Sequence, residues 1–250
     1  MQDIYVGDYG KGTPLVLVHG FLGSSKMWEP QIDYFKNYFR VITLDIPGFG
    51  KSNKAKSHNN IEDMAQVLMN RLNEKKINKF HLLGHSMGGM IVQEMTKISN
   101  NRVLKLVCYS TGSRGEMPGR FETVEKSIEN LKKKGLEFVV KRIVKTWFIN
   151  SENAKYFNTC IRSGMQSSSD SVNNALIAFK KWNGTNNLRN ITNKTLIIWG
   201  DQDKSYTLDQ IMLLKKNIKN SQLSIFKNCS HNVHLENLKK FNQTVKDFLR

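Results

Sequence analysis

The sequence predicts an α/β fold in which a mostly parallel β-sheet is covered by helices on both faces. Several short apolar runs lack polar alternation, which is typical of strands that are buried on both faces. These runs alternate with segments whose apolar residues recur every three to four positions, as on one face of a helix. Alternating strands and helices specify a parallel sheet, and binding sites in such sheets collect at the carboxyl ends of the strands.

The first half of the chain carries most of the strand signal. A weak strand is expected near residues 4–6, and a turn rich in glycine at 10–14 leads from it into the first strong apolar run. Each later strand is separated from the next by an amphipathic segment that packs on the sheet. The expected strands are 15–18, 41–45, 80–83 and 103–109, and the expected helices are 28–39, 61–72 and one that begins at 87.

The second half begins with a segment that has no strand signal. Four helical stripes occupy it, at 121–131, 136–148, 156–161 and 172–179. Strands resume at 195–199 and 223–226, with helices at 208–218 and 238–249. Helices inserted between two strands form a cap, so we expect residues 1–112 and 186–250 to form the core and residues 113–185 to form a helical cap insertion.

The length and composition limit the class of protein. A chain of 250 residues is long enough for one large core. No run of about 18 apolar residues is present, and the first residues lack the pattern of a signal peptide, so we expect a cytoplasmic protein without a membrane span. The cysteines Cys108, Cys160 and Cys229 are far apart and odd in number, which favours free thiols over disulfides or a zinc site. Chain length gives no oligomeric state.

The net charge of +17 raises the question of a nucleic-acid partner. The excess of Lys and Arg is similar inside and outside the segment 113–185, and only Lys132-Lys133-Lys134 forms a run. No stacking aromatic residues are interleaved with it, and no nucleic-acid motif is present. A solvated, lysine-rich surface is therefore the favoured interpretation, and we expect no nucleic-acid binding.

The pattern Gly-x-Ser-x-Gly at 84–88 stands between a predicted strand and a predicted helix. A serine at such a tight bend projects its hydroxyl away from the sheet, and glycines on both sides let the backbone pass closely. The bare pattern also occurs by chance in loops, so it needs context. Here the context makes Ser86 a candidate nucleophile.

Other loops at the same sheet edge supply the groups that a serine nucleophile needs. The loop 19–23 follows the strand 15–18, and it can present the Phe21 amide beside the Met87 amide as an oxyanion hole, although a plain strand-to-helix turn is the simpler alternative. Asp203 follows the strand 195–199, and His231 follows the strand 223–226. The order serine, acid, histidine is the order of α/β-hydrolases.

The whole chain resembles the α/β-hydrolase superfamily. The motifs that carry the resemblance are His19-Gly20, Asp45-x-Pro47-Gly48-x-Gly50-x-Ser52, Gly84-His85-Ser86-Met87-Gly88-Gly89, Gly200-Asp201-Gln202-Asp203, and His231 followed by Leu235-Glu236. The resemblance implies an α/β-hydrolase fold with a helical cap. It also implies Ser86 as nucleophile, Asp203 as acid, His231 as base and the Phe21 and Met87 amides as the oxyanion hole, and it implies no metal or organic cofactor.

Two of these assignments have a nearby competitor. Asp201 competes with Asp203, but the family pattern Gly-Asp-x-Asp places the acid at the second aspartate. His234 competes with His231, and the apolar-Glu pair that follows favours His231, although Ser230 stands where the family has a glycine. His19 and His85 are expected to be structural hydrogen-bonding residues.

The serine at the bend indicates acyl transfer, because relatives that open epoxides or remove halides have an aspartate there. The cap resembles that of 3-oxoadipate enol-lactonases and small carboxylesterases, which implies a small ester or lactone substrate and makes Trp147 a candidate pocket residue, with a plain core role as the alternative. Two other functions stay open. One is a hydrolase of carbon–carbon bonds in ring-cleavage products, and the other is a ligand receptor of the same fold.

Overall fold

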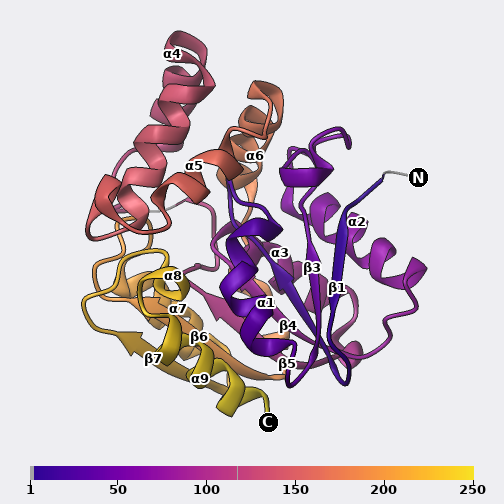
Figure 1. Cartoon of the computed structure of the whole chain (residues 1–250). Helices are drawn as coiled ribbons and strands as arrows, with labels where there is room; N and C mark the ends of the chain where they lie inside the picture. Colours follow the sequence, from indigo (N-terminus) through magenta and orange to yellow (C-terminus); the bar gives the residue numbers. More distant parts are fainter. Residues whose placement is uncertain (1–2, 117) are drawn as a thin grey trace.

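Seven strands form a single sheet in the computed structural model, which describes residues 3–116 and 118–250 (Figure 1). The strand order is β1-β3-β2-β4-β5-β6-β7, and every neighbouring pair is parallel except β1 with β3. The strands are β1 (Val6–Tyr9), β2 (Pro14–Val18), β3 (Arg40–Leu44), β4 (Phe80–His85), β5 (Val103–Tyr109), β6 (Lys194–Gly200) and β7 (Ser221–Phe226). The predicted mostly parallel α/β sheet is confirmed.

Helices cover both faces of this sheet because the side chains of each strand alternate between two cores. Leu15 and Leu17 face the core that includes α1 (Glu29–Phe35) and α9 (Leu238–Leu249). Val16 and Val18 face the other core, which includes the helices α2 (Ile61–Glu74), α3 (Met87–Ile98) and α7 (Leu208–Asn217). A short helix, α8 (Val233–Glu236), precedes α9.

The helix expected at 28–39 is shorter in the structure. A 3₁₀ turn at Ser25–Trp28 precedes α1, and α1 ends at Phe35. Phe39 lies beyond the helix but is buried in the same cluster as Phe35, with ring centroids 6.3 Å apart. The apolar pattern therefore reports burial of Phe39 rather than helical backbone at that residue.

Among the described residues between β5 and β6, the α-helices are α4 (Val124–Val144), α5 (Phe157–Gly164) and α6 (Ser169–Lys181). Two separate helical stripes were expected at 121–131 and 136–148, and they fall on the two halves of α4. Gly135 separates the halves with φ 80° and ψ 176°, a conformation that only glycine adopts readily. Both α5 and α6 pack against α4, and together they rise on one side of the molecule (Figure 1).

The chain leaves β5 and returns to β6 through two segments that lie side by side. The Gly115 amide donates a hydrogen bond to the Trp182 carbonyl oxygen at 2.9 Å, and the Gly184 amide donates to the Ser113 carbonyl oxygen at 2.8 Å. A Cβ at residue 115 would collide with the backbone of Phe179, so the approach requires glycine there. The segments on either side of α4–α6, at Ser113–Gly115 and Trp182–Gly184, are thus hydrogen-bonded to each other.

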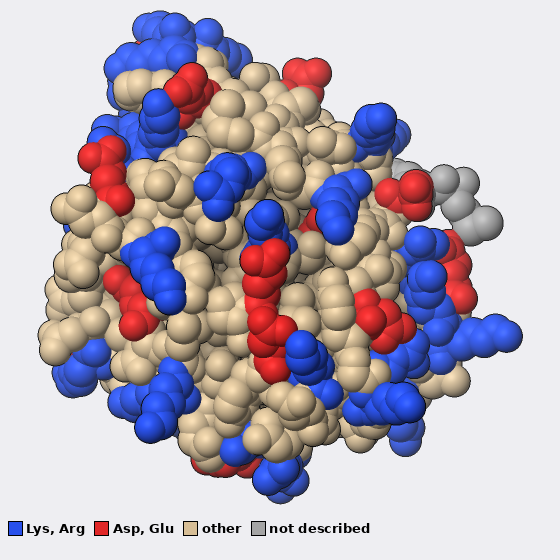
Figure 2. Space-filling view, viewed as in Figure 1, with Lys and Arg blue, Asp and Glu red and all other residues tan. Residues whose placement is uncertain are grey.

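Charged side chains are mixed on the face seen in Figure 2. Lys and Arg are scattered over it with Asp and Glu between them, and they gather most densely over the outer end of α4. Among the described residues, no helix has both the length and the apolar character needed to cross a membrane.

Candidate active site

Ser86 occupies the sharp bend between β4 and α3. Its backbone has φ 55° and ψ −119°, in a region that residues other than glycine rarely adopt, and such strain costs roughly 1–3 kcal/mol. Two hydrogen bonds hold the bend. The Ser86 amide donates to the Tyr109 carbonyl oxygen at 2.9 Å, and the Thr111 hydroxyl donates to the Ser86 carbonyl oxygen at 2.8 Å. The surrounding structure therefore fixes the position from which the serine side chain projects.

The glycines at 84 and 88 allow this bend to form. A Cβ at residue 84 would collide with the Gly88 carbonyl group, and a Cβ at residue 88 would collide with the carbonyl oxygens of Val18 and His19. The start of α3 can approach β2 and β4 this closely only without those side chains. The backbone amide of Met87, the first residue of α3, points out of the helix start because N-terminal amides have no intrahelical partner.

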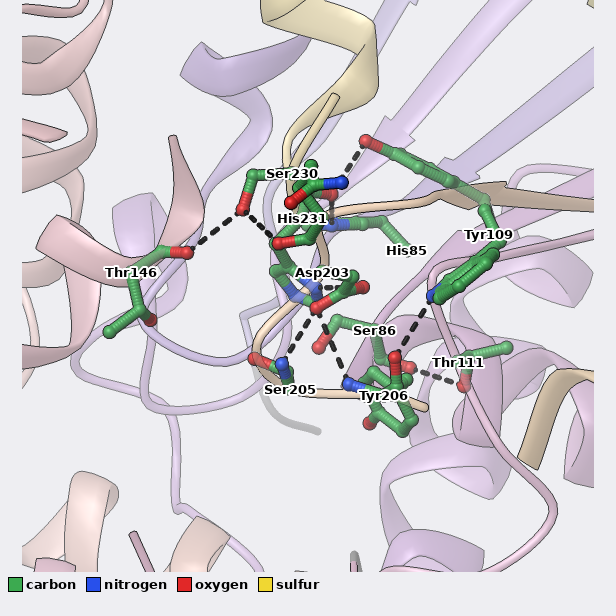
Figure 3. A network of polar contacts seen from close by, with 12 residues as sticks. His85, Ser86, Tyr109, Thr111, Thr146, Asp203, Ser205, Tyr206, Ser230 and His231 are labelled. Carbon is green, nitrogen blue, oxygen red and sulfur yellow. Dashed lines mark hydrogen bonds and ion pairs between the residues drawn. The ribbon is translucent and has the colours of Figure 1, made fainter. Parts of the chain in front are cut away.

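Asp203 and His231 meet beside this bend, from the loops that follow β6 and β7 (Figure 3). The Nδ1 atom of His231 lies 2.9 Å from Oδ2 of Asp203, and both side chains are buried. The other carboxylate oxygen, Oδ1, accepts hydrogen bonds from the amides of Ser205 at 2.7 Å and Tyr206 at 3.3 Å. These two amides fix the carboxylate, which in turn fixes the orientation of the imidazole.

The backbone of His231 is held by two side-chain donors from neighbouring strands. The Tyr109 hydroxyl donates to the His231 carbonyl oxygen at 2.9 Å, and Nε2 of His85 lies 3.2 Å from the same oxygen. Burial lowers the pKa of His85 well below its ordinary value, so its ring is neutral and can donate from Nε2. His85 thus supports His231 through a structural hydrogen bond.

Ser86 and His231 line one small cavity, with Phe21 and Trp147 in its other walls. The volume of about 20 Å³ is enough for about one water molecule. The Trp147 ring centroid lies 6.2 Å from that of His231, so this tryptophan closes the site from the inserted segment. Within the described residues, the Ser86 hydroxyl is not hydrogen-bonded to His231, and such contacts often tighten only when substrate binds.

Residues 13–238 match the family model described as the alpha/beta hydrolase fold. The chain belongs to this family. The predicted resemblance is thereby confirmed, and the protein is an alpha/beta hydrolase.

The alignments of this alpha/beta hydrolase with similar proteins span nearly the whole of both chains. The chain is 31% identical to the 2-hydroxy-6-oxononadienedioate/2-hydroxy-6-oxononatrienedioate hydrolase 1 of Pseudomonas putida, over 99% of this chain and 92% of the relative. It is 25% identical to the pimeloyl-[acyl-carrier protein] methyl ester esterase of Legionella pneumophila, over 100% of both chains. The crystal structure of the enol-lactonase from Burkholderia xenovorans LB400 superimposes with a TM-score of 0.90 at 20% identity, covering 98% of this chain and 96% of that one, which shows a shared fold.

The two competing residues lie outside the Asp203–His231 contact of this hydrolase. Asp201 Oδ2 lies 3.7 Å from the Lys227 ammonium group at the surface. His234 is fully buried, and its Nδ1 lies 3.0 Å from the Tyr109 hydroxyl. Burial lowers the pKa of His234 to about 3, so its ring packs as a neutral group. Neither Asp201 nor His234 makes the contact that joins Asp203 to His231.

His19 organises the loop that carries Phe21. Its Nδ1 donates to the Gly20 carbonyl oxygen at 2.8 Å, and its Nε2 accepts from the Ile46 amide at 3.0 Å. Burial lowers the pKa of His19, which agrees with a neutral ring that donates on one side and accepts on the other. The loop therefore has a fixed shape beside the cavity.

Sequence reasoning missed three polar residues in the cavity wall, Arg120, Ser205 and Tyr206. Tyr206 follows Asp203 by three residues in the same loop, so its proximity to the site could have been inferred. Arg120 stands before the first helical stripe of the inserted segment, and no local pattern predicts that its side chain turns toward Ser86.

Proposed function

We propose that this alpha/beta hydrolase cleaves a small carboxylic ester or lactone through an acyl-enzyme on Ser86. The observation that carries the proposal is the 2.9 Å contact between His231 and Asp203, in a cavity that Ser86 shares with His231. A serine hydroxyl is a weak nucleophile, and an adjacent imidazole oriented by a carboxylate is the usual means of activating it.

The reaction proceeds in two halves. Nε2 of His231 accepts the Ser86 proton while Oγ bonds to the substrate carbonyl carbon, and Asp203 stabilises the imidazolium that forms. The bond to the alcohol then breaks, and His231 returns the proton to the departing oxygen. In the second half His231 deprotonates a water molecule, whose oxygen attacks the acyl carbon. The bond between that carbon and Oγ of Ser86 then breaks, His231 returns the proton to Oγ, and the carboxylic acid is released. In a lactone both products remain one molecule.

The amides of Phe21 and Met87 are the donors for the negative charge on the carbonyl oxygen. Met87 starts α3, so the positive end of the helix dipole adds to its amide. Phe21 lies in the cavity wall on the opposite loop. Fixed donors of this kind contribute several kcal/mol in other hydrolases, because they are in place before the charge develops.

Residues 113–185 act as a cap that closes the site in this proposal. The support is that the Trp147 carbonyl oxygen accepts a hydrogen bond from the Asn232 amide at 3.0 Å, directly after His231. Trp147 also lines the cavity and would contact bound substrate. The cap thus both excludes water and shapes the pocket.

Hydrolysis of a carbon–carbon bond is the second candidate function. It is favoured by the 31% identity to the Pseudomonas putida hydrolase, which is named for 2-hydroxy-6-oxononadienedioate and 2-hydroxy-6-oxononatrienedioate. Both candidates require Ser86, so the substrate decides between them.

The test is a panel of p-nitrophenyl esters, lactones and vinylogous diketones, assayed with wild type and Ser86→Ala. We expect ester or lactone turnover in wild type, and a fall to background in Ser86→Ala, because removing the nucleophile of such a site costs on the order of 10⁵-fold or more in kcat. Ser169→Ala, an exposed serine at the start of α6, is the matched control and should retain full activity. Turnover of only the diketones would favour the carbon–carbon hydrolase, and binding without turnover would favour a receptor.

A further inference from the structure

Arg120 borders the reaction cavity from the inserted segment. Its Nη1 donates to the Glu122 carbonyl oxygen at 2.7 Å and lies 3.2 Å from the Ser127 hydroxyl, so one edge of the guanidinium is anchored. The guanidinium carbon also sits 4.6 Å from the centre of the Phe121 ring. The side chain is partly buried and lines the same cavity as Ser86 and His231. Its position is therefore fixed by the protein and shared with the reacting groups.

The positive charge of Arg120 has no carboxylate of its own. The nearest acidic residue in sequence is Glu122, whose carboxylate is bound to Nε of Arg142 at 2.5 Å and to the Ser127 hydroxyl at 2.6 Å. In residues 3–116 and 118–250, no Asp or Glu lies within ion-pair distance of the Arg120 guanidinium. Burial lowers the pKa of Arg120, but a guanidinium remains protonated at neutral pH. A cation thus lines the cavity with no described carboxylate in direct contact, and the nearby Glu122 charge acts on it without forming an ion pair.

Tyr206 brings an unused hydrogen-bond donor to the same cavity. Its ring stacks on the His231 ring, with centroids 5.9 Å apart and planes 12° apart, and the residue is 1% exposed. The hydroxyl lies beside the side chains of Ser86 and Thr111, yet it makes no hydrogen bond of good geometry within the described chain. A buried hydroxyl without a partner costs free energy, which a ligand acceptor would recover.

We propose that Arg120 and Tyr206 form a carboxylate-binding subsite beside Ser86, and that the substrate is an ester or lactone carrying a second, ionised carboxylate. This inference rests on the proposed function for the reaction, but the subsite itself can be tested by binding alone. One carboxylate oxygen would pair with the free edge of the Arg120 guanidinium, and the Tyr206 hydroxyl would donate to the other. A neutral substrate would leave both groups desolvated and unpaired, which is how a polar site rejects an analogue.

The space around Arg120 supports a substrate that extends past it. The cavity at Ser86, at about 20 Å³, has room for about one water molecule, whereas Arg120 also borders a second cavity of about 460 Å³. Lys180 and Glu125 lie in the wall of that cavity and pair with each other at 3.0 Å. Arg120 is thus a charged group that lines both the cavity of the reacting residues and the larger cavity, whose wall also holds Glu116 and Glu122.

The test compares acidic esters with neutral analogues of the same shape. The acids are the monomethyl esters of succinate, glutarate and adipate, and each neutral partner is the methyl ester in which a methyl ketone replaces the free acid. Methanol release gives kcat/KM for wild type, Arg120→Met, Tyr206→Phe and Arg162→Met. Arg162 is an exposed arginine of α5 that donates to Thr159, so its variant removes the same charge from the inserted segment without touching the cavity.

We expect wild type to prefer at least one acid over its neutral partner. Arg120→Met should lower kcat/KM for that acid by about 10- to 100-fold, as expected for a charge-assisted hydrogen bond, and should leave the neutral ester within about twofold. Tyr206→Phe keeps the ring on His231 and should lower kcat/KM for the acid by a smaller factor. Arg162→Met should behave as wild type. Equal loss for acid and neutral ester in Arg120→Met would show a purely structural role and would overturn the proposal.

A binding measurement separates the subsite from the reaction. Ser86→Ala protein is titrated with the same acids and ketones by calorimetry, and the double variant Ser86→Ala with Arg120→Met is titrated in parallel. Tighter binding of an acid that disappears in the double variant would support the subsite even if no ester were hydrolysed. If none of the three acids binds more tightly than its ketone partner, the subsite is wrong, whatever the outcome of the activity assays.

Discussion

Glu236, at the end of α8, accepts a hydrogen bond at 2.7 Å from the backbone amide of Ile149, which lies in the segment between β5 and β6. Its other carboxylate oxygen accepts from the Ser230 amide at 2.6 Å, directly before His231. One side chain therefore ties the loop of His231 to the stretch that carries Trp147. Ser230 adds to this connection, because its hydroxyl lies 3.1 Å from the Thr146 carbonyl oxygen and 3.2 Å from that of Gln202 and can donate to either.

Replacing Glu236 should weaken both the fold and the site. Hydrogen bonds to a charged group are worth about 1.5–3 kcal/mol each, so Glu236→Ala is expected to lower the free energy of unfolding by about 2 kcal/mol or more. Activity should also fall, because the His231 loop loses one of its anchors. Urea unfolding followed by circular dichroism measures the first effect, and ester turnover measures the second.

Glu152→Ala is the matched control for Glu236. Glu152 is an exposed residue of the inserted segment that pairs with Lys145 at 2.7 Å, and such surface pairs contribute about 0–1 kcal/mol. It should leave stability and turnover almost unchanged. An equally small effect of Glu236→Ala would contradict the role assigned to its carboxylate.

Replacing each of the two aspartates in the loop after β6 should have very different effects on kcat. Asp203→Asn removes the charge that orients and stabilises the His231 ring, and the expected loss in kcat is on the order of 10³- to 10⁴-fold. Asp201→Asn weakens the 3.7 Å ion pair with the exposed Lys227 and should change kcat by about twofold or less. Steady-state kinetics on one ester substrate decides the matter, with circular dichroism to show that both variants are folded. The reverse order of effects would move the acid to Asp201.

Gly88 is expected to tolerate no side chain. In Gly88→Ala the new Cβ would press on the carbonyl oxygens of Val18 and His19, which belong to backbone and cannot rotate away. Overpacking of this kind costs about 1–3 kcal/mol, and the shift of α3 should also misplace Ser86 and reduce turnover. Thermal unfolding and ester hydrolysis measure the two effects.

Gly112→Ala provides the comparison for that substitution. A Cβ at residue 112 would have its nearest neighbours, two atoms of the Tyr206 ring, at 3.4 Å, which is an ordinary contact. This variant should remain within about 0.5 kcal/mol of wild type. Similar stability of the two variants would show that the bend at Ser86 adapts more easily than its close contacts indicate.

The sheet could be predicted because its strands are buried on both faces, so runs such as Leu15–Val18 are uniformly apolar. The meeting of Asp203 and His231 follows from the same topology, since β6 and β7 are parallel and end at one edge of the sheet. Their order along the chain and their motifs then select these residues over Asp201 and His234. In a parallel sheet, residues that follow neighbouring strands lie close together at one sheet edge even when they are far apart in sequence.

Other features depend on contacts that no local pattern encodes. The division of α4 at Gly135 agrees with the two separate stripes expected at 121–131 and 136–148, but the dihedral angles of the glycine between them could not be predicted from spacing. Arg120 lines the cavity beside Tyr206, and the adjacent Phe121 amide donates a hydrogen bond to the Lys204 carbonyl oxygen at 3.1 Å, a contact between residues far apart in sequence. The roles of Arg120 and Tyr206 thus follow from tertiary packing around Ser86 rather than from residue spacing.

His81 should make the protein less stable in acid. The side chain packs edge-on against Phe39, with ring centroids 5.9 Å apart, and its Nδ1 has no hydrogen-bond partner in the described chain. Burial is the main cause that lowers the pKa of His81 to about 4, and the nearby Lys105 charge lowers it further. In the unfolded chain the pKa of histidine is near ~6.5, so between these values only the unfolded state binds the proton. Stability therefore falls as the pH is lowered from about 6.5 toward 4, by at most about 1.4 kcal/mol per pH unit for this residue.

His81→Gln removes the protonation of this side chain, so the free energy of unfolding should fall less steeply as the pH is lowered. Urea unfolding at pH 8, 6.5, 5.5 and 4.5 compares the variant with wild type, and the difference at pH 8 gives the cost of lost packing alone because neither state of His81 is protonated there. The two curves should converge as the pH falls, since wild type loses the extra stability that the variant never had. Curves that stay parallel from pH 8 to 4.5 would mean that His81 binds its proton equally well in the folded and unfolded states.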